Sequence, residues 1–133
     1  MNFWVTYPLV AHPYNPEFLT KSGLTRFSVA AEAAGFSGIG FTDHPAPSER
    51  WLAAGGHDAL DPLTALAFCA AVTDRLRLIP NILVLPYRNP FLVAKAGATL
   101  DALSDGLSDA DSLELSLDVS LVSLVNDVVI VTP

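Results

Sequence analysis

Short apolar runs alternate with amphipathic stretches along the first hundred residues. Runs rich in β-branched, aromatic or small apolar residues occupy positions 5–10, 37–42 and 78–85, a composition typical of strands. The run at 78–85 is almost continuously apolar, as expected of a strand that is covered on both faces. We therefore expect three strands here. Gly38 and Gly40 are expected to let a neighbouring backbone or a ligand come close to the second one.

Each predicted strand is followed by a stretch with helical periodicity. The first helix is predicted from residue 16 to about residue 34, with Gly35 as its stop. The second is expected to begin at Asp61, with proline in its first turn, and to end in the cationic segment 75–77. The third is predicted over 91–103. Three strands alternating with three helices predict an α/β fold with a parallel sheet and right-handed crossovers.

The pattern changes after Ser104. Residues 107–133 contain no Gly, Lys, Arg or aromatic residue, apolar and polar residues alternate over 113–121, and 128–131 is a second strand-like run. One interpretation is a pair of antiparallel strands that closes the sheet. The other is an atypical Ser/Leu/Asp/Val-rich tail, irregular or translated in a shifted reading frame. The absence of a turn glycine or an Asn-Gly pair favours the second interpretation.

Charge and composition exclude several classes of protein. The formal net charge is −7, and residues 96–133 contain seven acids but no Lys or Arg. Nucleic-acid binding is not expected, because phosphate contacts need clustered cations. No window approaches the roughly 20 consecutive apolar residues of a membrane span, and the N-terminus lacks the basic region of a signal peptide. Cys69 lies in an apolar run and is expected to be a buried inert thiol. Because a single cysteine cannot form a disulfide within the chain, a cytoplasmic location is the default.

Candidate chemistry lies at the end of the second predicted strand, where Asp43 and His44 stand side by side. Sites in parallel sheets and barrels lie at the carboxyl ends of strands, and an unperturbed His titrates near neutrality. The alternative is a polar turn in which Asp43 caps the loop. Arg88, after the third strand, is a weaker candidate for holding an anionic substrate or coenzyme group, and pairing with a nearby acid is its alternative.

The remaining polar and aromatic candidates carry less weight. His12 and His57 show no metal-ligand spacing with Asp43 and His44, so no metal site is expected and both are interpreted as solvated loop residues. Trp4 and Trp51 are interpreted as packing within the core or a loop rather than as stacking platforms.

Three segments resemble the bacterial luciferase-like monooxygenases: residues 35–44 (GFSGIGFTDH), 81–90 (NILVLPYRNP) and 94–104 (AKAGATLDALS). The resemblance covers roughly residues 3–106 and is closest to the branch that uses the deazaflavin coenzyme F420 rather than FMN. It implies a TIM-type (β/α)8 barrel. Residues 1–106 would form its N-terminal part, with the first three βα units, and residues 107–133 would be an atypical tail.

The resemblance also implies roles for particular residues. Asp43 and His44 match the acid–histidine pair that lies beside the redox ring, so they are expected to contact coenzyme and substrate and to carry catalysis. Asn81 and Ile82 match positions where a non-proline cis peptide supports the ring face. The expected coenzyme is deazaflavin F420, with FMN as the alternative, and the expected reaction is hydride transfer or oxygenation of an unknown small molecule.

One departure from the family pattern follows Ser104. The family continues with Gly-Gly-Arg and a glycine-rich strand, whereas this chain has Asp105, Gly106 and Leu107. A complete barrel needs about 250 residues. Two interpretations remain open: an oxidoreductase whose barrel is completed by a homo-oligomer or another partner, or a catalytically inert, truncated or frame-shifted family remnant.

Overall fold

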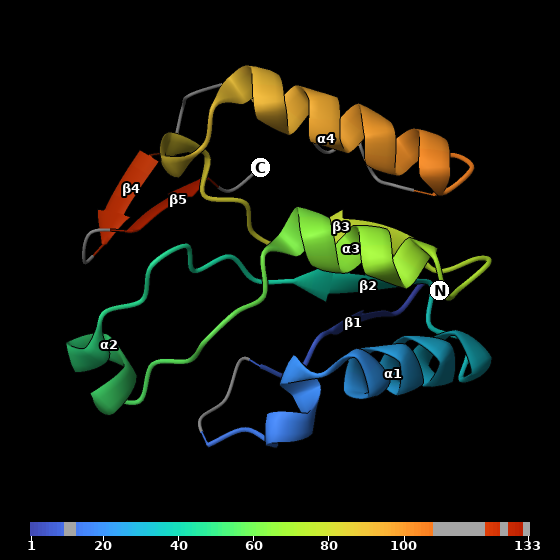
Figure 1. Cartoon of the computed structure of the whole chain (residues 1–133), viewed down its shortest axis with the longest axis horizontal. Coiled ribbons are helices and arrows are strands. Elements are labelled where there is room, and N and C mark those ends of the chain that lie inside the picture. Colours follow the sequence, from blue (N-terminus) through green and yellow to red (C-terminus); the bar gives the residue numbers. More distant parts are fainter. Residues whose placement is uncertain (10–12, 108–121, 126–127, 132–133) are drawn as a thin grey trace.

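Three short parallel strands form the centre of the molecule. The computed structural model describes residues 1–9, 13–107, 122–125 and 128–131. Strands β1 (Trp4–Thr6), β2 (Gly38–Phe41) and β3 (Arg77–Pro80) pair in the order β1-β2-β3, with Trp4 opposite Gly38 and Gly38 opposite Arg77. The predicted parallel α/β arrangement is therefore confirmed (Figure 1).

The long helices follow the strands in the expected alternation. They are α1 (Lys21–Ala33), α3 (Pro62–Ala70) and α4 (Pro90–Leu103), with a short α2 (Glu49–Ala53) and two 3-10 turns, η1 (Pro16–Leu19) and η2 (Leu85–Tyr87). Helices α1 and α3 pack on the sheet, and α4 lies along α3 (Figure 1). Side-chain caps set the helix starts: the Asp61 carboxylate accepts from the Thr64 amide at 2.9 Å.

The core lies between the sheet and these helices. Ile39 and Leu78 point into it from the strands, and Leu66 of α3 meets them with none of its surface exposed. Tyr7 stacks on Phe41 with ring centroids 5.0 Å apart. Of the three strands only β2 is buried at every position, which fits its run of small and apolar residues. β1 and β3 are partly exposed, so the expectation that the third strand is covered on both faces is wrong.

The opposite face of the sheet is more open. It borders a hollow of about 250 Å³ lined by Trp4, Val5, Thr6, Gly40, Ile79 and Asn81. A Cβ atom at position 38 would collide with the Trp4 ring and lie 2.8 Å from the main-chain oxygen of Arg77. The prediction that these glycines allow close approach is confirmed, and the neighbours are a tryptophan ring and a strand backbone.

Two predicted strands are shorter than expected. The first strand was expected over residues 5–10, but β1 ends at Thr6. The Tyr7 amide still donates to the Gly40 oxygen at 2.9 Å, and Pro8 then has no amide hydrogen to donate. Residue 10 lies outside the described residues. The prediction of a strand over 78–85 is wrong beyond Pro80. The Asn81 amide still donates to the Phe41 oxygen at 2.9 Å. Further along, the Val84 amide donates to the Asp43 carboxylate at 2.9 Å and so has no strand partner.

Two predicted helices also differ from the structure. The first is divided at Thr20, because the Thr20 hydroxyl accepts from the Gly23 amide and starts α1 anew after η1. The second ends at Ala70, before the cationic segment 75–77 that was expected to close it. Glu32 holds that segment instead, since one of its carboxylate oxygens accepts from the amides of Asp74, Arg75 and Leu76 at 3.0, 2.6 and 3.0 Å.

After α4 the chain returns to the outer edge of β3. The Leu107 oxygen accepts from the Leu78 amide at 3.1 Å, following a turn in which Asp105 and Gly106 have φ values of 54° and 80°. Strands β4 (Val122–Val125) and β5 (Val128–Val131) pair antiparallel in a sheet of their own. The strand-like run at 128–131 is thus a strand but does not extend the parallel sheet. Residues 113–121 lie outside the described residues, and the boundary of the tail stays a prediction.

Candidate functional site

A polar cleft opens where the strands end at their carboxyl side. It has a volume of about 260 Å³ and is lined by three segments: the loop after β2, the residues before α3 and the loop after β3. The lining residues are Asp43, His44, Pro45, Ala59, Leu60, Asp61, Tyr87 and Arg88. The connections of a parallel sheet therefore bring together residues that are up to 45 positions apart in sequence.

Asp43 forms the buried base of this cleft. Its side chain is 2% exposed. One carboxylate oxygen accepts from the Val84 amide at 2.9 Å, and both oxygens accept from the Arg88 guanidinium at 2.9–3.2 Å. This fork-shaped pairing fixes the loop after β2 against the loop after β3. The carboxylate has its bonding capacity committed to the protein.

Arg88 joins a second carboxylate to the same network. Its Nη2 atom lies 2.8 Å from Asp61, the residue that caps α3. Burial works against the charge on Arg88, but the hydrogen bonds with Asp61 and Asp43 outweigh it and raise the pKa of the guanidinium. Burial likewise raises the pKa of Asp61, and hydrogen bonds from Thr64 and Arg88 more than reverse this, so the pKa lies below its ordinary value. Both groups are therefore charged near neutral pH.

His44 is the lining residue of the cleft whose ordinary pKa lies closest to neutrality. It is half-buried and lies directly after Asp43. Burial lowers the pKa of its imidazole below 6.5, and the nearby His57 lowers it further, while Asp43 and Asp58 act in the opposite direction. The net result is an imidazole that is uncharged near neutrality, which is the state able to accept a proton.

Two aromatic side chains flank His44. Its ring centroid lies 4.5 Å from that of His57 in an edge-to-face contact, and 4.7 Å from that of Trp51. The interpretation of His57 as a solvated loop residue is wrong, because His57 is half-buried on the His44 ring. A local signal existed in the sequence, the Gly55-Gly56 pair before His57, but nothing in it identified the partner.

Comparisons with known proteins identify the family of the chain. The sequence model of the family described as luciferase-like monooxygenase matches residues 3–106. The chain belongs to this family. It is 39% identical over 84 residues to an F420-dependent glucose-6-phosphate dehydrogenase from Beutenbergia cavernae, a match that spans 62% of this chain and 24% of that protein.

A solved structure gives the same assignment. The monooxygenase RslO1 from Streptomyces bottropensis is 25% identical in sequence, with a TM-score of 0.61 over 89% of this chain and 38% of that one. The fold class predicted from the sequence, an α/β fold whose parallel strands form part of a TIM-type barrel, is confirmed. The assignment of residues 1–106 to its N-terminal part stays a prediction. The luciferase-like chain thus spans about a quarter of the curated relative and little more than a third of the solved structure.

Asn81 and Ile82, the other predicted coenzyme-binding residues, do not line this cleft of the luciferase-like fold. Asn81 lines the hollow on the open face of the sheet and is not among the residues lining the cleft with His44. Ile82 is half-buried next to it. Arg88 lies in the cleft as predicted, but it is paired with two carboxylates, which matches the alternative of a structural ion pair.

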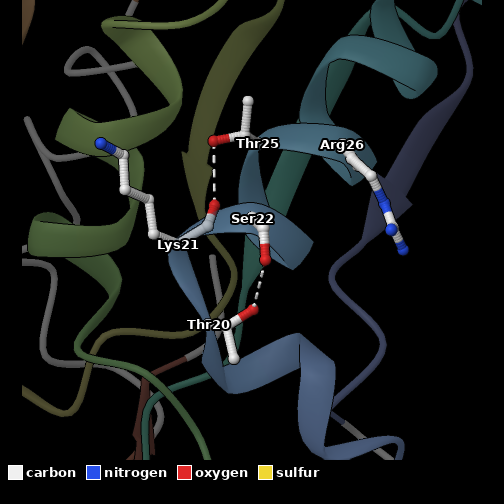
Figure 2. A pocket seen from close by; sticks show the side chains of 5 residues that line it. All are labelled: Thr20, Lys21, Ser22, Thr25 and Arg26. Atoms are coloured by element: carbon white, nitrogen blue, oxygen red, sulfur yellow. Dashed lines mark hydrogen bonds between the residues drawn. The ribbon is translucent and has the colours of Figure 1, made fainter.

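A larger surface depression, of about 490 Å³, lies at the start of α1 and is a weaker candidate (Figure 2). Thr20 and Ser22 bond to each other, Thr25 bonds to a main-chain oxygen, and the Lys21 and Arg26 side chains point away from one another (Figure 2). Arg26 is also paired with Glu17 at 2.8 Å. The hydroxyls and cations here do not converge on one ligand position.

Membrane and metal chemistry receive no support within the described part of the chain. No helix there has the length and apolar character needed to cross a bilayer. No group of three or more His, Cys, Asp or Glu side chains gathers there in an arrangement suited to a metal ion.

Proposed function

We propose that the cleft at the strand ends is the coenzyme-ring and substrate site of an F420-dependent oxidoreductase, with FMN as the alternative coenzyme. The observation that carries this proposal is the position of His44: a half-buried, uncharged imidazole at the mouth of a cleft whose base is the buried Asp43–Arg88–Asp61 network. The named activity of the Beutenbergia relative supports the choice of coenzyme.

The size and charge of the cleft suit one portion of such a coenzyme. Its volume of about 260 Å³ lies below the ~300–1,000 Å³ typical of sites that enclose a whole small-molecule ligand. Within the described cleft the guanidinium of Arg88 is already neutralised by Asp43 and Asp61. We therefore assign the ring portion of the coenzyme to the cleft, and its anionic groups need cations from outside the cleft.

The chemistry assigned to the protein is proton transfer and positioning. A bound deazaflavin supplies a ring that exchanges a hydride with the substrate. His44 accepts the proton of a substrate hydroxyl as the adjoining carbon gives up its hydride, and returns it to solvent. Asp43 acts on His44 through the backbone: its bonds to Val84 and Arg88 hold the loop in place.

Coenzyme titration tests the proposal. Adding F420, and separately FMN, to the purified chain is expected to change the coenzyme absorbance and to quench Trp51, read in a Trp4→Phe background. His44→Gln is expected to reduce turnover at least tenfold with a smaller change in Kd. A Lys21→Gln variant at the start of α1 serves as the matched control and should bind normally. The absence of any spectral change up to millimolar coenzyme contradicts the proposal.

The second candidate is a catalytically inert family remnant. The observation that favours it is the departure from the family pattern after Ser104, where Asp105, Gly106 and Leu107 stand in place of the expected Gly-Gly-Arg. For the oxidoreductase candidate, we propose that activity requires a second copy of this chain or another chain that completes the barrel. Sedimentation velocity with and without coenzyme separates the two: a monomer that binds nothing supports the remnant, and coenzyme-dependent assembly supports the oxidoreductase.

A further inference from the structure

His57 lies at a position that the proposed chemistry does not use, yet its ring contacts His44. The two rings meet edge to face with centroids 4.5 Å apart, and Trp51 contacts both, at 4.7 Å from His44 and 5.4 Å from His57. Three aromatic side chains therefore form one cluster beside the cleft. We name it the His44 cluster and define it as His44, Trp51 and His57.

The loop between β2 and α3 is built so that it delivers these two side chains. The Ser48 hydroxyl accepts from the Trp51 amide at 3.2 Å and sets the start of α2. Gly55 has φ +95°, a conformation that favours glycine. A Cβ atom at Gly56 would collide with the Trp51 ring. The loop thus turns back over Trp51 and carries His57 to the His44 ring.

The orientation of His57 is fixed from its other side. Its Nδ1 atom lies 3.2 Å from the main-chain oxygen of Asp58, which accepts a hydrogen bond when Nδ1 carries the proton. The Asp58 carboxylate in turn accepts from the Ala59 amide at 2.9 Å, and Ala59 lines the cleft. The backbone that orients His57 is therefore continuous with the wall of the cleft.

We propose that His57 is a positioning residue for His44: with Trp51 it encloses the imidazole on the side away from the cleft and holds its ring toward the bound ligand. The role is distinct from catalysis, since His57 itself does not line the cleft. The effect of His57 on turnover of a substrate rests on the function proposed above. The physical consequence, a constrained and shielded His44, does not depend on any ligand.

The charged surroundings of His44 agree with this role. Burial is the first cause of the lowered pKa of His44 and the charge of His57 is the second, so loss of the His57 ring removes contributions of both kinds. Glu49 and Arg50 of α2 are exposed. The other charged or titratable groups near His44 are those of the adjoining loops and the cleft: Asp43, Asp58, Asp61, Tyr87 and Arg88.

Histidine NMR titration of the coenzyme-free protein tests the proposal. The His44 ring signals, assigned by their loss in His44→Gln, are followed with pH in the parent, His57→Phe and His57→Ala proteins. In the parent, His44 is expected to titrate below 6.5. His57→Phe keeps a packed ring and is expected to move the pKa of His44 part of the way toward 6.5. His57→Ala exposes the ring and is expected to move it further.

The outcomes separate this proposal from the proposed function. Equal His44 titrations in all three proteins overturn the positioning role, and so does a larger change in His57→Phe than in His57→Ala. Urea unfolding of each variant checks that it is folded, and His57→Gln replaces any variant that is not. If the protein shows the expected titrations but binds no coenzyme, the proposed function is overturned and the positioning role of His57 is supported. In an active assembly, His57→Ala should lower kcat and shift the acidic limb of its pH profile upward, with KM little changed.

Discussion

The two ends of the parallel sheet are each held by one carboxylate, and they differ in what surrounds it. At the amino end, Glu32 accepts three consecutive amides from residues 74–76 and ties α1 to the start of β3. At the carboxyl end, Asp43 accepts the Val84 amide and the Arg88 guanidinium and ties two loops together. Each carboxylate accepts at least one hydrogen bond from a main-chain amide that would otherwise lack a backbone acceptor, because the strands are short.

The difference lies in the neighbours. Glu32 caps a closed turn, whereas the network of Asp43 forms the base of an open cleft with His44 on its rim. In barrels of parallel strands the amino end serves stability and the carboxyl end serves chemistry. Similar carboxylate–backbone bonding therefore occurs at both ends of the sheet. The open cleft with His44 on its rim lies at the carboxyl end, where we propose that the function resides.

The largest expected effect is at the carboxyl end. Arg88→Ala leaves Asp43, with its 2% exposed side chain, without its cation, and we expect a loss of about 3 kcal/mol in the free energy of unfolding. Urea denaturation measures it. Arg26→Ala is the matched control: it breaks the pair with Glu17 at a side chain that is 71% exposed, where about 0–1 kcal/mol is expected. Equal losses in the two variants contradict a buried network.

Loss of the carboxylate at the amino end of the sheet is expected to cost less stability and to leave coenzyme binding unchanged. Glu32→Ala removes the acceptor for the Asp74, Arg75 and Leu76 amides, and a loss of about 1–3 kcal/mol is expected. Glu32→Gln keeps an acceptor oxygen and should lose less. Coenzyme affinity, measured at a temperature where both variants are folded, should match the parent. A weakened affinity would mean that the two ends of the sheet are coupled.

A gain in stability is expected at the turn that leads from α4 back to the sheet. Asp105 has φ 54° and is the one described non-glycine residue with a positive φ, next to Gly106 at φ 80°. Asp105→Gly restores the glycine pair expected from the family resemblance and should stabilise the chain by roughly 0.5–1 kcal/mol. Gly106→Ala is the opposite control and should destabilise it. Thermal unfolding of the three proteins measures both changes.

The smallest expected effect is a pH dependence at the carboxyl end. The pKa of His44 is lowered from 6.5 in the folded state, so the unfolded chain binds the proton more readily. Stability should therefore fall as pH drops from 6.5 through the folded pKa, and be independent of this group above that range. The difference in urea midpoints between the parent and His44→Gln isolates the contribution. A difference that stays constant between about pH 8 and 5 contradicts the assigned direction.

Much of this architecture follows from the sequence. Apolar runs at the three strand positions, capping residues such as Asp61 and the amphipathic stretches between them predict an α/β fold with parallel strands. These signals are local, since each depends on residues within one or two turns or on simple periodicity. The position of Asp43 and His44 at a strand end was also readable, because carboxyl ends of parallel strands share one edge.

The contact partners of Arg88, Val84 and His57 were decided by the tertiary structure alone. Arg88 is 45 positions from Asp43, and its commitment to two carboxylates instead of a ligand depends on how the two loops approach each other. The third strand ends at Pro80, and beyond it the Val84 amide donates to the distant Asp43 carboxylate. His57 reaches His44 because Gly55 and Gly56 let a loop turn over Trp51. Periodicity carries no information about such contacts, since they arise from the folding of separate segments onto one another.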